Sequence, residues 1–123
     1  MNTEARLLVE QSLPYIEAFL IEDNSFYPFA MLMNRRMTAL PIDPDISEEF
    51  PASEYLIGLF EGTIRKELKK INNIYILGII CVDVYIDTDI RGVEFRLFNA
   101  LEEKKFYLSY SILNESTIVW SRV

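Results

Sequence analysis

The strongest structural signal in this chain is a run of alternating side chains that begins at Ile74 and ends at Asp87. Every second position from Ile74 onward is almost always β-branched, which is typical of a strand. The intervening positions begin apolar, at Tyr75 and Leu77, and become mostly polar from Cys81 onward. Such a strand is predicted to be buried on both faces at its start and to turn one face toward water at its end.

Two further segments, 93–98 and 106–112, alternate in a similar way, and a last strand is expected at 117–122. Short turn-forming stretches separate them, so we expect neighbouring strands to pair antiparallel. A register that brings the apolar faces together predicts three contacts between these strands. They are Val84 with Val93 or Phe95, Leu97 with Leu108, and Asp83 with Arg96.

The N-terminal part predicts a helix over 3–23, kinked at Pro14 or restarted after Ser12 as a cap. Two short strands are expected next, at 26–33 and 37–42, followed by an exposed connection that contains three prolines.

A second helix is expected from Ala52 or Ser53 to Ile71, because apolar residues recur there at steps of three and four. Ser53 is the expected cap. Gly58 and Gly62 lower helix stability, so we interpret them as points of close packing against the sheet.

Together these segments predict a single α+β domain spanning residues 1–123, with the order α-β-β-α-β-β-β-β. The sheet is expected to be mostly antiparallel, with five to six strands and both helices packed on one face. A chain of 123 residues is long enough to bury a real core without disulfides.

The composition excludes several chemistries. The chain has no histidine and one cysteine, Cys81. Ser-His-Asp and Cys-His catalysis, a disulfide within the chain and a cysteine zinc site are therefore impossible. Cys81 lies in an apolar run and is expected to be a buried, inert thiol. We predict no catalytic, cofactor-binding or metal-binding residue.

The charge and the hydropathy of the chain restrict the classes of binding partner and the cellular location that we expect. The formal net charge is −7, from 19 acidic and 12 basic side chains, which argues against nucleic-acid binding. No apolar run is long enough to span a bilayer, and the N-terminus does not resemble a signal peptide. We therefore expect a cytoplasmic protein that does not enter the membrane.

One group of carboxylates raises the question of enzymatic chemistry. Asp83, Asp87, Asp89 and Glu94 lie on or between two neighbouring predicted strands, where carboxylates hold hard cations or form an acid/base pair. Their spacing matches no calcium-binding loop. We therefore expect structural roles, with Asp83 paired to Arg96 and the next two acids in a hairpin turn.

Aromatic residues give a second candidate site. Phe26, Tyr27 and Phe29 cluster along the chain, and further tyrosines lie on the predicted strands. The pattern places Tyr85, Phe98 and Tyr107 together on the polar face of the sheet. Three aromatics there are more than a solvated face needs, so either they bind a partner or another segment covers them.

The acidic side chains are unevenly distributed. Residues 43–61 carry six acids and no base, whereas residues 65–70 carry four bases and one acid. An acidic loop near an aromatic patch is suited to steer a basic protein partner, although an ordinary solvated loop has the same composition. The candidate acids are Asp43, Asp45, Glu48 and Glu49.

The layout resembles that of small uncharacterised bacterial α+β proteins. The residues that carry the resemblance are Phe26-Tyr27-Pro28-Phe29-Ala30, Asp83-Val84-Tyr85-Ile86 and Val93-Glu94-Phe95-Arg96-Leu97. Some similar small acidic proteins are immunity proteins, which bind and block a toxin in the cytoplasm. The resemblance implies no catalytic residue.

The leading hypothesis is a non-enzymatic protein-binding domain, an immunity or inhibitor protein for a bacterial toxin being one form of it. One alternative is a chaperone for a secreted protein, which predicts a homodimer. Another is a carboxylate- or metal-dependent enzyme that uses Asp83, Asp87 and Glu94. A structural subunit that docks through a strand edge or its aromatic face is a further alternative.

Overall fold

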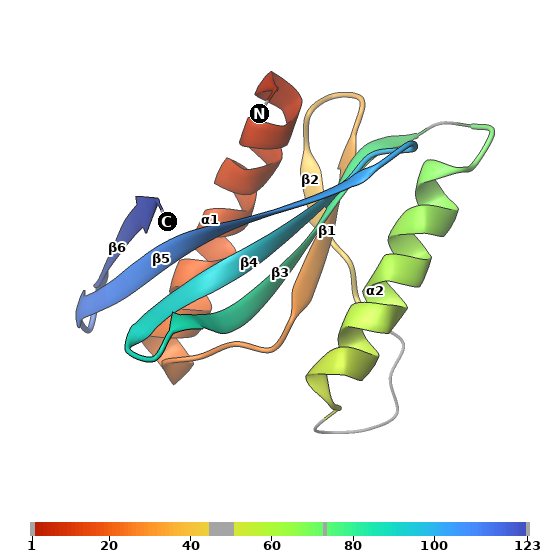
Figure 1. Ribbon diagram of the computed structural model, residues 1–123. Helices are drawn as coiled ribbons and strands as arrows, with labels where there is room; N and C mark the ends of the chain where they lie inside the picture. The colour runs from red at the N-terminus through yellow and green to blue at the C-terminus, as the bar shows by residue number, and fades with distance from the viewer. Residues whose placement is uncertain (1, 45–50, 73, 123) are drawn as a thin grey trace.

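The computed structural model describes residues 2–44, 51–72 and 74–122. Within these ranges the chain forms two helices and one antiparallel sheet of six strands, in the strand order β2-β1-β3-β4-β5-β6 (Figure 1). The α+β class and the predicted element order are confirmed. The bounds are α1 Thr3–Asp23, β1 Phe29–Asn34, β2 Ala39–Pro41, α2 Ser53–Leu68, β3 Tyr75–Asp87, β4 Ile90–Phe98, β5 Glu103–Asn114 and β6 Thr117–Arg122.

The two helices pack on opposite faces of the sheet, so the prediction that both lie on one face is wrong (Figure 1). On β1, Met31 and Met33 belong to the core beneath α1, whereas Ala30 and Leu32 belong to the core beneath α2. Because β1 and the first half of β3 are apolar at both parities, each of their faces must be covered by a helix.

The register between β3 and β4 also differs from the prediction. Asp83 lies opposite Val93, and Val84 lies opposite Gly92. Asp83 therefore shares the α1 face of the sheet and does not contact Arg96, whose ion pair is with Glu94. The sequence interpretation assigned Asp83 to water, but polar partners on the α1 face accommodate its carboxylate.

The expected contact between Leu97 and Leu108 is not formed as a cross-strand pair. Leu97 lies opposite Lys104, and Leu108 lies opposite Val93. Both leucines nevertheless face α1 and its core. The pairing of the apolar faces was correctly expected, but their register along the strands was not.

Local chemistry explains the limits of α1. The side chain of Asn2 accepts a hydrogen bond from the backbone amide of Ala5, which caps the start of the helix. Asn24 ends it in the left-handed conformation, with φ 63°. Pro14 lies inside a continuous helix, and the buried Ser12 hydroxyl donates to the Val9 carbonyl within it. The predicted restart after Ser12 is therefore wrong.

The helical glycines do not mark close packing. A β-carbon at Gly58 or Gly62 would have no heavy atom within 4 Å outside its own helix segment. The close approach is at Gly78 on β3, where a β-carbon would lie 2.5 Å from Cγ2 of Ile64. The glycine that lets α2 approach the sheet is therefore on the strand. The residue at the N-terminal boundary of α2 is Ala52, and Ser53 is the first helical residue.

Neither helix in the described part of the chain combines the length and the apolar character needed to cross a bilayer.

Candidate functional site

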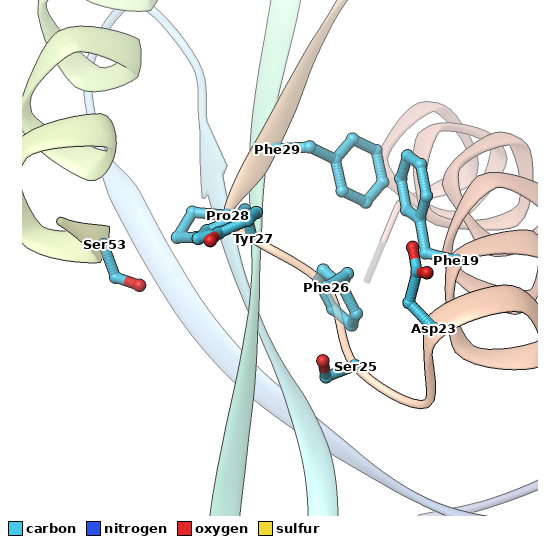
Figure 2. Close-up of a pocket in the computed structure, with 8 residues that line it drawn as sticks. All are labelled: Phe19, Asp23, Ser25, Phe26, Tyr27, Pro28, Phe29 and Ser53. Atoms are coloured by element: carbon cyan, nitrogen blue, oxygen red, sulfur yellow. The ribbon is translucent and has the colours of Figure 1, made fainter. Parts of the chain in front are cut away.

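Aromatic side chains gather where α1 ends, where the connection 24–28 leads into β1, and where α2 begins (Figure 2). They surround a cavity of about 590 Å³. We call this cavity the aromatic groove. Its lining residues are Phe19, Asp23, Ser25, Phe26, Tyr27, Pro28, Phe29 and Ser53.

Ring contacts hold one wall of the aromatic groove in place. The ring of Phe29 packs edge-on against Phe19, with 5.7 Å between centroids, and against Phe26, at 6.0 Å. Tyr15 adds a fourth ring, 6.3 Å from that of Phe29. Rings that already pack on one another lose little freedom when a ligand binds, so this wall is preorganised.

Parts of these aromatics remain accessible. Phe19 is 37% exposed and Tyr27 is 53% exposed, and Tyr15 is exposed on the same stretch of α1. Exposed aromatics gathered at one place are unusual on a monomeric surface and are typical of binding sites.

The groove continues around the start of β1 toward α2. A second cavity of about 410 Å³ shares Phe19, Tyr27, Pro28 and Phe29 with the first, and the name aromatic groove covers both cavities. Its far side is formed by the edge of the sheet and by the first turns of α2. The residues there are Pro41, Ile42, Asp43, Pro44, Pro51, Leu56 and Phe60.

The charge around these cavities is negative. Asp23 lines the first cavity and Asp43 lines the second, and no lysine or arginine is among their described lining residues. The sequence has no basic residue from 7 to 34 or from 37 to 64. The last turn of α1 has no base either, so the negative end of its dipole is not offset there.

Polar contacts fasten the connection that forms the floor of the groove. The backbone amide of Phe26 donates to Asp83 on β3 at 3.3 Å. Arg91, on β4, donates to the side chain and the carbonyl of Asn24, and its guanidinium lies 3.6 Å from Asp83. The Tyr110 hydroxyl donates to the same carboxylate at 2.7 Å. The groove is therefore anchored to the centre of the sheet.

The aromatic patch expected from the sequence is not formed. Phe98 is 1% exposed and packs in the core beneath α2, with Arg65 over its ring. Tyr85 is 71% exposed but lies opposite Arg91, at the other end of β4 from Phe98. Tyr107 is exposed and donates to Glu94, on the face away from α1. The three rings do not meet because the β3–β4 register places Tyr85 on the same face as Asp83 and Val93, whereas Phe98 packs on the face covered by α2.

The expected acidic site residues divide into two groups. Asp43 lines the groove, as described above. Asp45, Glu48 and Glu49 lie outside the described residues. Their contribution to the surface therefore stays a prediction.

The carboxylates that the enzyme alternative requires are dispersed. Asp83 faces α1, where Tyr110 contacts it, whereas Glu94 points to the other face and contacts Tyr107 and Arg96. Asp87 is exposed in the hairpin turn, where its side chain accepts from the amide of Thr88. Among the described residues, no group of three potential metal ligands comes together.

The groups with perturbed pKa values have structural causes. Burial raises the pKa of the Glu94 carboxyl, but hydrogen bonds from Arg96 and Tyr107 outweigh this and hold it below its usual range. Burial raises the pKa of the Cys81 thiol, which stays protonated in the core.

Several of the groove residues can be recognised as aromatics in the sequence, but the sequence does not show that they form one groove. The sequence shows Phe26, Tyr27 and Phe29 as a cluster along the chain, whereas Tyr15 and Phe19 fall on the apolar stripe of the helix predicted over 3–23. The available signal was the width of that stripe. In the second half of α1, Ile16 and Leu20 are the buried residues, which leaves the neighbouring aromatics for a second surface.

Comparison of the chain with protein-family models, with curated proteins and with solved structures found no match.

Proposed function

We propose that this protein is a non-enzymatic binding domain that holds a basic segment of a partner protein in the aromatic groove. The observation that carries the proposal is that exposed aromatics at Tyr15, Phe19 and Tyr27, the first two held by ring contacts, lie beside the acids Asp23 and Asp43.

The chemistry of the groove suits lysine and arginine side chains. Aromatic faces attract cations, and nearby carboxylates supply the counter-charge. The chain uses the same contact internally, with the guanidinium of Arg91 5.0 Å from the centroid of Tyr110. Because the net charge is −7, long-range attraction would also speed the approach of a basic partner.

An immunity or inhibitor protein for a bacterial toxin is the form of this role that the resemblance implies. In that form a bacterial, cytoplasmic protein would capture a basic toxin and keep it from its target. The acids Asp45, Glu48 and Glu49 belong to the proposal as part of the electrostatic attraction.

The groove can be tested with a display library of short random peptides selected against the whole protein. We expect the selected peptides to be enriched in lysine and arginine and to bind more weakly as salt rises. Tyr27→Ala is expected to weaken their binding at least about ten-fold, which is the usual cost of losing an aromatic anchor.

Tyr85→Ala is the matched control, since Tyr85 is also an exposed tyrosine but lies outside the groove. It should leave peptide binding unchanged. Selection of acidic or neutral peptides, or equal binding by the Tyr27→Ala protein, would contradict the proposal.

A further inference from the structure

One edge of the sheet is long and lacks the usual protection. β6 pairs with β5, and no other described strand lies beside it. Its six residues, Thr117–Arg122, contain no proline or glycine and one charge, at the end. Edge strands of this kind are ready to pair with another strand.

The opposite edge of the sheet is formed by β2, and it is protected against pairing. β2 has three residues and ends in Pro41, which cannot donate a backbone hydrogen bond. Short length and proline are two of the common ways in which proteins block an edge. β6 is therefore the unblocked outermost strand of the sheet, five strands away from the β2 edge that borders the aromatic groove.

We propose that β6 pairs with β6 of a second copy of this chain, antiparallel, around a two-fold axis at Val119. This pairing joins two sheets into one and leaves the groove of each copy open. It is independent of the proposed function, because it uses other residues.

The sequence of β6 is what favours a second copy over another partner. With the axis at Val119, this residue faces its own copy, Ile118 faces Trp120, and Thr117 faces Ser121. Each pair matches apolar with apolar or hydroxyl with hydroxyl. Directly opposed residues point to the same face of a sheet, so the α1 faces of the two copies become continuous.

Charge supports the same register. The two-fold axis places Arg122 of one copy opposite Ser116 of the other, next to Glu115 in the turn between β5 and β6. Shifting the axis to Trp120 would instead place Arg122 opposite Ile118. An axis at Val119 therefore pairs apolar with apolar and hydroxyl with hydroxyl over residues 117–121, which an axis at Trp120 does not.

The contact is smaller than the interfaces of permanent dimers, so the association is expected to depend on concentration. Sedimentation velocity of the whole protein, from about 10 μM to about 1 mM, should show monomers converting to dimers. Val119→Lys places two like charges on the axis and should abolish the dimer, as should Val119→Glu.

Mixing the Val119→Lys and Val119→Glu proteins should restore the dimer, because opposite charges then meet at the axis. A misfolded variant would not be rescued in this way. Ser111→Lys is the matched control, since Ser111 is exposed directly across from Val119 on β5 but lies one strand away from the axis. It should dimerise like the unchanged protein.

A sedimentation coefficient that stays constant up to about 1 mM, or a dimer that survives both Val119 substitutions, would overturn the proposal. So would a mixture of the two variants that remains monomeric although circular dichroism shows both to be folded.

Discussion

The carboxylate of Asp83 accepts a hydrogen bond from the backbone amide of Phe26, with 3.3 Å between nitrogen and oxygen. Its other oxygen accepts from the hydroxyl of Tyr110 at 2.7 Å. One side chain on β3 thus joins the floor of the aromatic groove to β5. The polar end of β3 has a structural reason, which is to fix the groove on the sheet.

Replacing Asp83 is therefore expected to affect both stability and the groove. Asp83→Ala leaves Tyr110 without its acceptor and frees the amide of Phe26, so we expect a loss of about 2 kcal/mol in the free energy of unfolding. Urea denaturation measures this loss. Asp87→Ala is the control, because Asp87 is exposed in the hairpin turn, and it should cost less than about 0.5 kcal/mol.

Tyr110 should make the protein sensitive to alkaline conditions. Burial and the hydrogen bond to Asp83 raise the pKa of Tyr110 above its ordinary value of about 10. Above that pH the unfolded chain loses the tyrosine proton while the folded protein keeps it, so stability falls as pH rises. Tyr110→Phe should flatten this decline in thermal unfolding measured from pH 9 to 11.5, values set about the ordinary pKa.

Tyr85→Phe serves as the comparison for that experiment, because Tyr85 is exposed and has no described role in the core. Its alkaline decline should match that of the unchanged protein. An equally steep decline in the Tyr110→Phe protein would show that other groups cause it.

Glu94 should make the stability of the protein depend on pH under acidic conditions. Desolvation raises its pKa, but the hydrogen bonds from Arg96 and Tyr107 hold the pKa below the usual range, so the folded state favours the charged form. This stabilisation is present above the unfolded pKa of about 4.3 and is lost as pH falls through the lower, folded pKa. Glu94→Gln should be about 1 kcal/mol less stable at neutral pH and should decline less steeply in acid.

The control for Glu94 is Glu115→Gln, in the exposed turn between β5 and β6. Its acid denaturation curve should follow that of the unchanged protein. A Glu94→Gln curve parallel to the unchanged one down to low pH would argue against the charged cluster.

The element order could be predicted because alternation and turn residues act locally along the chain. The side on which each helix packs could not, although β1 held the clue. Consecutive apolar residues such as Leu32 and Met33 point to opposite faces, so a strand made of them needs cover on both. A sheet with one helical layer leaves one of those faces in water.

The groove was harder to predict because it joins three segments that are distant in sequence. Phe19, Tyr27 and Ser53 meet only after α1 and α2 have been placed on their own faces of the sheet. The register of β3 and β4 was missed for a related reason. The acid at Asp83 was assigned to water, whereas Tyr110, another polar residue on the same face, accommodates it.

Gly78 on β3 lets α2 approach the sheet closely, at Ile64. Gly78→Ala would bring a β-carbon to 2.5 Å from Cγ2 of Ile64, so the helix must shift, and we expect a cost of about 1–3 kcal/mol. Gly62→Ala meets no neighbour within 4 Å and should stabilise the helix by about 0.5–1 kcal/mol. Urea denaturation should therefore give opposite signs for the same chemical change.

The Ile64→Ala substitution decides whether the contact itself causes the Gly78 effect. Ile64→Ala removes the atoms that the new β-carbon would strike, at the expense of a cavity in the core. If the clash is the cause, Gly78→Ala should cost much less in the Ile64→Ala background than in the unchanged protein. Additive losses in the double variant would mean that Gly78 matters for the strand backbone and not for the approach of α2.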